Sequence, residues 1–226
     1  MKNKMFLVTL LFLAGNFFGF SADIIYVQKD GSEKVVSVDD NANSIQIFER
    51  EGWHSVTIEG IEALKNLKRI ELYPLPFMTD FSFLSLDYIE ELYIGSHCVT
   101  INDFSFLNGM RGLKNLEVID LRVSKDTEIN LKNVGIDFSA LKKLEKLTFT
   151  LALEDEVDSH DMYFVPKFKN VKGKPELDLS NELIKEFSKD DIKVLKQFSS
   201  VCLIGNPVLE NETEMKKLAK AKITVK

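Results

Sequence analysis

The sequence predicts an α/β fold in which short repeating units stack their strands into one parallel sheet. Two observations predict it: a short phrase recurs along the chain, and a strand-like apolar pattern recurs with it. Self-similarity at a period of roughly 20 to 50 residues is typical of repeat architectures, because one unit cannot cover its own apolar face. We expect about six stacked strands, an N-terminal β-hairpin cap and a short helical C-terminal cap.

The recurring phrase reads DFSFL at 80–84 and 103–107, DFSAL at 137–141 and, more faintly, EFS at 186–188. Each aspartate is placed to cap the turn that follows it by accepting free backbone N–H groups; these are Asp80, Asp103 and Asp137. The second residue of each phrase is a phenylalanine, which is expected to point into the core and to stack on the phenylalanine of the next unit. These residues would form a spine of Phe81, Phe104, Phe138 and Phe187.

The strand pattern is apolar-x-x-apolar-x-apolar, and it is preceded in several units by a turn of the form L-x-x-L. Its alternation at the end is typical of a short, half-buried strand. The middle residues of the six segments are Ile70, Leu92, Ile119, Leu147, Leu177 and Val201, separated by 22, 27, 28, 30 and 24 residues. This spacing assigns the repeats to residues 59–206, with irregular insertions before residue 137 and over 154–174.

The N-terminal end begins with a predicted secretory signal over residues 1–21, with cleavage after Ser21. Residues 22–58 are predicted to form a β cap. Its first hairpin pairs Ile24–Gln28 with Lys34–Val38 around an Asp-Gly turn at 30–31. A second strand pair, 45–49 with 53–58, is expected beside it, with Trp53 sealing the join to the first repeat.

The C-terminal end is predicted to be a cap over residues 207–226. Glu212–Ala221 can form a short helix with Met215 and Leu218 on one face, and residues 223–225 can add an edge strand. A weak capping box at Ser188–Asp191 is expected to open another short helix before the last strand.

The pattern over about residues 53–206 resembles the leucine-rich repeat family, and most closely its bacterial internalin and protein-phosphatase-regulator type. That type writes an acidic-apolar-Ser-x-x-Leu phrase after each strand, which 80–82, 103–105 and 137–139 match. The family usually places an asparagine three positions after the strand, and here only Asn206 fits among Leu75, His97, Ser124, Ala152, Glu182 and Asn206. The resemblance implies a solenoid that recognises other proteins.

The charge of the chain argues against nucleic acid as a partner. Without Lys2 and Lys4 the chain carries 27 basic and 35 acidic residues, a net charge of −8. Nucleic-acid and anionic-membrane binding use clustered Lys and Arg. No segment after the signal is apolar enough to span a membrane, so no membrane insertion is expected, and the composition with its signal suggests an exported bacterial protein that is periplasmic, surface-associated or secreted.

Residues with catalytic or ligand chemistry do not form a convincing set. The three histidines, His54, His97 and His160, fall in different units, so no enzyme and no cofactor is expected. The acidic run at 154–161 could gather a cation such as Ca²⁺, but a solvated loop explains it as well, and its spacing is not that of an EF-hand. Cys98 and Cys202 lie about four strands apart, too far for a disulfide.

The face of the sheet that points away from the core is the predicted binding surface, because Tyr and Arg are common anchors of interfaces. We expect a protein partner on Arg69, Glu71, Tyr73, Glu91, Tyr93, Asp120, Arg122, Lys146, Thr148 and Asp178. The function indicated is non-enzymatic protein recognition. The alternatives are a cation-binding or carbohydrate-handling protein that uses the acidic run, and a structural periplasmic scaffold.

Overall fold

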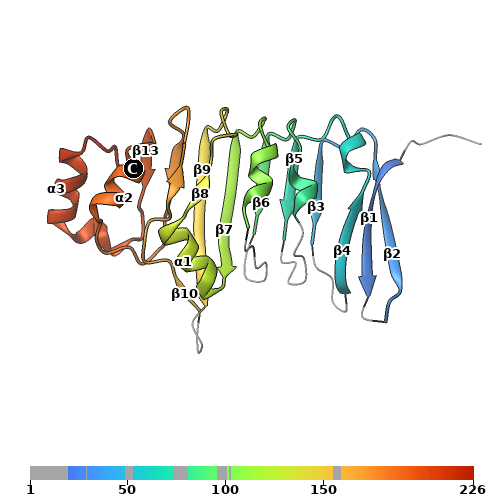
Figure 1. Ribbon diagram of the computed structural model, residues 1–226, viewed down its shortest axis with the longest axis horizontal. Helices are drawn as coiled ribbons and strands as arrows, with labels where there is room; N and C mark the ends of the chain where they lie inside the picture. The colour runs from blue at the N-terminus through green and yellow to red at the C-terminus, as the bar shows by residue number, and fades with distance from the viewer. Residues whose placement is uncertain are drawn as a thin grey trace, which may run out of the picture.

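The computed structural model describes residues 20–28, 30–48, 53–73, 81–95, 101, 103–154 and 159–226, with no side chains described at 20, 21, 53–55, 154, 159 and 160. Within these residues, the fold is a mixed α/β arrangement around a sheet of seven parallel strands in the order β3-β5-β6-β7-β9-β12-β13 (Figure 1). The seven are β3 (Ser44–Ile47), β5 (Arg69–Leu72), β6 (Glu91–Ile94), β7 (Asn115–Val123), β9 (Lys146–Glu154), β12 (Glu176–Asp178) and β13 (Ser200–Cys202).

The register of the sheet places one apolar residue of each strand beside the next. The row runs through Ile45, Ile70, Leu92, Leu116, Leu147, Leu177 and Val201, and all seven are buried. A second buried position follows two residues later in each of the first five strands, as period-two alternation requires. The prediction of a parallel sheet is therefore confirmed, with seven strands where the sequence indicated about six.

The predicted register of β7 is wrong by three residues. The middle position belongs to Leu116, not to Ile119, and Val118, which was expected to face outward, is fully buried. The cause is an irregularity in β7, where Asp120 adopts a left-handed φ of 48° and the pairing with β9 resumes at Leu121. Apolar residues before and after this bulge both match the apolar-x-x-apolar-x-apolar pattern. The sequence is therefore consistent with two alternative frames, that is, two assignments of the buried positions in β7.

The N-terminal sheet is antiparallel, with the order β2-β1-β4. The predicted hairpin is confirmed, because β1 (Phe20–Gln28) pairs with β2 (Glu33–Asp39) across a turn where Gly31 has a φ of 80°. The predicted second pair is wrong. β4 (Trp53–Glu59) pairs with β1, whereas β3 joins the parallel sheet. The side chain of Trp53 lies outside the described residues.

Short 3₁₀ turns precede several parallel strands, and two of the three predicted aspartates accept from the turns that follow them, as predicted. Asp103 accepts from the backbone N–H and the hydroxyl of Ser105 at 2.8 and 2.6 Å, and Asp137 accepts from the N–H of Ser139 at 2.9 Å. Asp80 lies outside the described residues. The turns are η1 (Ile61–Ala63), η2 (Ser82–Leu84), η3 (Ser105–Gly109) and, near the C-terminus, η4 (Pro207–Glu210).

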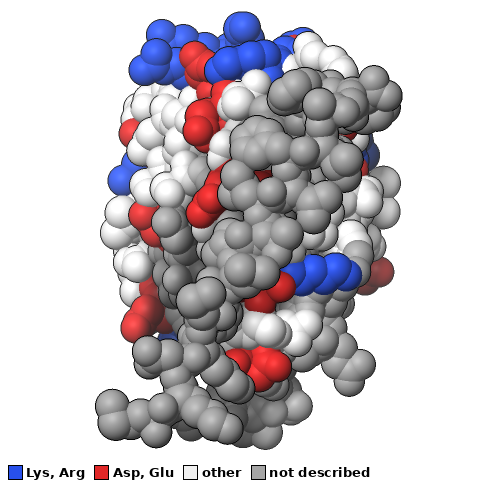
Figure 2. Space-filling view, turned by 90° about the vertical axis from the view of Figure 1, so that its right-hand side faces the viewer, with Lys and Arg blue, Asp and Glu red and all other residues white. Residues whose placement is uncertain are grey.

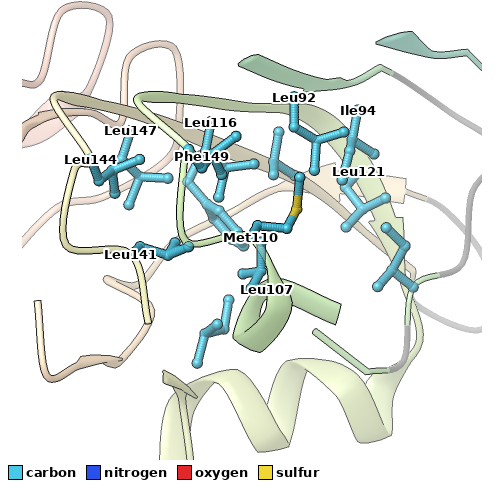
Figure 3. Close-up of a cluster of buried hydrophobic side chains, with 14 of the residues drawn as sticks. Leu92, Ile94, Leu107, Met110, Leu116, Leu121, Leu141, Leu144, Leu147 and Phe149 are labelled. Atoms are coloured by element: carbon cyan, nitrogen blue, oxygen red, sulfur yellow. The ribbon is translucent and has the colours of Figure 1, made fainter. Parts of the chain in front are cut away.

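One continuous core fills the space between the sheet and these turns (Figure 3). Phe81, Phe138 and Phe187 are buried and Phe104 is half-buried, so the predicted inward direction is confirmed for them. The rings of Phe81, Phe104 and Phe138 are joined through other phenylalanines rather than stacked directly. The contacts, with centroids 5.4–6.2 Å apart, link 81 to 106, 106 to 104, 104 to 149, 149 to 168, and 168 to both 138 and 198.

The insertion before residue 137 contains a helix that the sequence analysis treated as a loop. This helix, α1 (Lys125–Asn133), begins at Ser124, whose side chain accepts from the N–H of Thr127. It packs near the C-terminal ends of β7 and β9. The buried Glu128 on α1 binds Lys132 at 2.6 Å and the Tyr163 hydroxyl at 2.7 Å, which ties α1 to the second insertion.

The second insertion and the C-terminal end contain the remaining elements. The predicted capping box is confirmed, since Ser188 and Asp191 exchange hydrogen bonds at the start of α2. The edge strand at 223–225 is reduced to one parallel bridge between Val225 and Val201. The elements are β8 (Ile136–Asp137), β10 (Ser159–Asp161), β11 (Phe168–Lys169), α2 (Lys189–Leu195) and α3 (Glu212–Lys220).

Two polar residues at equivalent places support the loops after the last strands. Asn206 is buried, accepts from the N–H of Ile184 and donates to the carbonyl of Leu179 at 2.7 Å. Glu182, at the same place one unit earlier, is also buried, and its carboxylate accepts from the N–H groups of Leu151 and Met162 at 3.1 and 2.5 Å. A carboxylate thus satisfies loop backbone where the resemblance implies asparagine.

Candidate functional site

The face of the parallel sheet that points away from the core carries two polar rows. Because side chains alternate across a strand, the residues on either side of the buried middle position share this outer face. One row runs through Gln46, Glu71, Tyr93, Glu117, Thr148, Asp178 and Cys202, and the other through Ser44, Arg69, Glu91, Asn115, Lys146, Glu176 and Ser200.

A hydrogen-bond network joins three neighbouring strands on this face, with Glu71 at its centre. The Glu71 carboxylate accepts from Arg69 Nε at 2.5 Å, from Gln46 Nε2 at 2.7 Å and from the Tyr73 hydroxyl at 2.9 Å. Arg69 also donates to Glu91 on β6 at 2.5 Å. The network fixes long side chains before any partner arrives, which lowers the entropy that binding would cost.

Two tyrosines lie side by side within this network. The ring centroids of Tyr73 and Tyr93 are 5.4 Å apart and the planes are tilted by 44°. Both side chains are half-buried, and the Tyr93 ring lies across the backbone of Gly95, where an added Cβ would be 2.5 Å from the ring. The rings therefore offer a pre-ordered apolar surface with a polar edge, the kind of group that anchors interfaces.

The electrostatics of this region favour ionised acids. Burial raises the pKa of Glu71, but hydrogen bonds from Arg69, Tyr73 and Gln46 outweigh it and lower the pKa below its ordinary value. The pKa of Tyr93 is raised, first by burial and then by Glu117 and other nearby carboxylates. One arginine faces three glutamates at positions 71, 91 and 117, so the region retains a negative charge. We call Arg69, Glu71, Tyr73, Glu91, Tyr93 and Glu117 the Tyr–Glu patch.

The other predicted residues lie on the same sheet but outside this patch. Thr148 and Lys146 on β9 are in the two outer rows, with Thr148 buried and Lys146 exposed. Asp178 on β12 turns its carboxylate toward the N–H of Ser180 at 3.0 Å. Asp120 lies on the β7 bulge, where its N–H donates to the Thr150 hydroxyl.

Arg122 lies beyond the bulge, paired in register with Ala152. The structure thus brings together Arg69, Glu71, Tyr73, Glu91 and Tyr93, and leaves the remaining five predicted residues dispersed along β7, β9 and β12.

Sequence reasoning missed three residues that complete the face. Gln46 was assigned to the cap, and Glu117 was lost through the β7 register error. Asn115 donates to Glu117 at 2.8 Å and continues the polar network onto β7. The buried Leu116 and Val118, which flank Glu117 in the sequence, fit a frame with Glu117 on the outer face, but Ile119 and Leu121 fit the alternative frame equally well.

The other candidate residues fall largely outside the described part. His97, Cys98 and residues 155–158 lie there, as do the side chains of His54 and His160. Cys202 is half-buried with a free thiol. Among the described residues, no three His, Cys, Asp or Glu gather as a metal site would require, and none of the described helices has the length and apolarity to cross a membrane.

An open hollow of about 370 Å³ lies on the opposite side of the molecule, between η3, α1 and β8. Polar groups line it above an apolar floor that includes Leu131 and Ile136. Its two carboxylates, Asp103 and Asp137, already accept hydrogen bonds from the turns that they cap, and Asp137 also accepts from Asn170. Because these carboxylates are already engaged in holding the turns, the hollow is a weaker candidate for a binding site than the outer face of the sheet.

Comparison with models of known protein families and with curated protein sequences gave no match for this chain.

Proposed function

We propose that this chain is an exported, non-enzymatic repeat protein of the leucine-rich solenoid kind, and that it recognises another protein through the Tyr–Glu patch. The observation that carries the proposal is the network of Arg69, Glu71 and Tyr73 with Gln46 and Glu91, held on an exposed sheet face. Stacked units with capped turns and a shared apolar row support the solenoid interpretation.

The chemistry of the patch indicates the kind of partner. Paired tyrosines offer apolar area with a hydrogen-bonding edge, and Glu91, whose side chain is 44% exposed, stands at the rim with Glu117. A segment that presents an apolar side chain beside Lys or Arg would bury the rings and pair with the carboxylates. Such a partner is expected to associate more slowly as salt concentration rises, because rim charges act mainly on the association rate and are screened by salt.

Affinity capture from cells of the source organism tests the proposal with three baits. The wild-type chain is expected to capture a specific protein, and Y73A/Y93A is expected to lose it. The matched control I129A/V134A truncates two exposed apolar residues, one on α1 and one at its C-terminal cap, away from the sheet face, and should capture as the wild type does. Circular dichroism confirms that all three baits are folded. Equal capture by the tyrosine variant and the wild type would refute the proposal.

A further inference from the structure

A row of cations runs along one edge of the parallel sheet, although the chain as a whole carries a net charge of −6. The row occupies the turn that enters each strand, five residues before its buried middle position. The residues there are Asp40, Lys65, Asp87, Arg111, Lys142, Lys172 and Lys196, so acids stand at two of the seven positions and cations at five. Figure 2, which views the sheet from its N-terminal end, shows Lys and Arg gathered at the top, the edge where these turns lie.

The turns stack, so the row is a feature of the structure and not only of the sequence. In Lys65, Arg111 and Lys142 the backbone N–H donates to the carbonyl two residues earlier, at 2.9–3.0 Å in each case. A Cβ on Gly112 would lie 2.4 Å from the Asp87 carbonyl oxygen, and one on Gly173 would lie 3.7 Å from that of Lys142. Each turn therefore lies directly against the turn of the preceding strand.

Four consecutive members of the row are cationic: Arg111, Lys142, Lys172 and Lys196, which we call the basic row. They enter the neighbouring strands β7, β9, β12 and β13. Strands lie about 4.8 Å apart, so the row extends over about 14 Å. All four side chains are exposed, and none makes an ion pair or side-chain hydrogen bond with the described residues. By contrast, Lys68 and Lys114, nearby on the same edge, both bind Glu90.

An open hollow lies beside the first half of the basic row. It measures about 550 Å³ and is lined by Asn108, Arg111, Ser139, Ala140, Lys142 and Lys143. Three cations, an amide and a hydroxyl thus surround one depression. Like charges held this close repel one another, so the arrangement does not stabilise the fold and is better explained by an anion that it receives.

We propose that the basic row binds a linear anionic polysaccharide that carries sulfate or phosphate groups, with one such group seated in the hollow. A polymer chain fits because the cations form a single file, whereas a flat membrane would also meet the acids of this edge, such as Asp87 and Glu145. Single-stranded nucleic acid is disfavoured because it needs exposed aromatic rings for stacking. Phe138 and Phe198, beside these turns, are buried.

Fluorescence anisotropy with a labelled heparin oligosaccharide tests the proposal. The wild type is expected to bind with an affinity that falls steeply as salt rises, because binding releases counterions. The variant R111Q/K142Q/K172Q/K196Q should bind at least about tenfold more weakly, with a flatter salt dependence. The control K34Q/K185Q/K216Q/K220Q changes the net charge equally at exposed lysines elsewhere and should bind as the wild type does.

The same titration with single-stranded oligothymidylate and with vesicles rich in anionic lipid separates the other occupants. Tighter binding of either one than of the oligosaccharide would overturn the proposal, as would equal affinity of the basic-row variant and its control. The basic row and the Tyr–Glu patch share no residue. A failure of heparin binding with normal protein capture therefore counts against the basic row alone. A failure of protein capture with normal heparin binding counts against the Tyr–Glu patch alone.

Discussion

At the scale of single residues, two buried glutamates show how this chain uses carboxylates as structural acceptors. Glu71 is surrounded by side-chain donors, which keep it ionised. Among the described residues, Glu182 accepts from two backbone N–H groups, and burial raises its pKa to about 8, with Asp161 and Asp120 adding to the rise. The pKa shifts of the two glutamates are opposite because Glu182 is more deeply buried and only Glu71 is compensated by a cation.

Removal of Glu71 is expected to destabilise the fold. In Glu71→Ala, Gln46 and Tyr73 lose their acceptor and Arg69 loses one of its two carboxylates. The free energy of unfolding should fall by about 1–3 kcal/mol in urea titration. Glu91→Ala is the matched control, since Glu91 is largely exposed and its loss should cost less than about 1 kcal/mol. Equal losses for the two variants would contradict the central place given to Glu71.

Glu182 predicts a pH dependence of stability. Its pKa is about 8 in the folded chain and 4.5 as the ordinary value, so the folded state holds this proton more tightly than the unfolded state does. Stability is therefore highest below pH 4.5 for this group and falls as pH rises to about 8, by up to about 1.4 kcal/mol per pH unit.

In Glu182→Gln this part of the slope should disappear, and the difference between variant and wild type should grow from pH 5 to pH 8 in urea titrations. Titratable groups other than Glu182 contribute equally to both proteins, so their contributions cancel in the comparison. A difference that does not change with pH would contradict the raised pKa.

At the scale of elements, the strands and their turns follow from the sequence, but their frame does not always do so. The buried middle positions of β5, β6, β9, β12 and β13 are those that the pattern predicts. In β7 the sequence around Asp120 is consistent with two assignments of the buried positions, because apolar side chains point into the core both before and after the bulge. Nothing in a period-two pattern decides between such frames, so Glu117 was missed and Asp120 was placed in the row instead.

A pair of alanine substitutions tests the corrected frame of β7. Val118 is fully buried and Ile119 is half-buried on the other face. Val118→Ala should lower the free energy of unfolding by about 1–3 kcal/mol, whereas Ile119→Ala, although it removes more atoms, should cost less than Val118→Ala. Urea titration of both variants gives the comparison, and a larger loss for Ile119→Ala would restore the frame that the sequence pattern indicated.

At the scale of the whole molecule, the parallel sheet, the antiparallel N-terminal sheet and the C-terminal helix could be predicted, because each depends on local pattern and turn chemistry. A strand at 45–49 was predicted, but its place as the seventh strand of the parallel sheet was not, since β3 lacks the L-x-x-L turn that marks several of the others. The Tyr–Glu patch was predicted as a face. Its hydrogen-bond network depends on contacts between strands 22–25 residues apart, which no single segment contains.

Site-specific photocrosslinking in cells of the source organism tests the central claim most directly. Benzoylphenylalanine would replace Glu117 or Lys146 on the outer face in one set of strains, and Ile129 or Leu183, exposed residues off this face, in another. We expect a discrete protein adduct from the outer-face positions only. An adduct from Ile129 or Leu183 with none from Glu117 and Lys146 would contradict recognition through the outer face of the sheet.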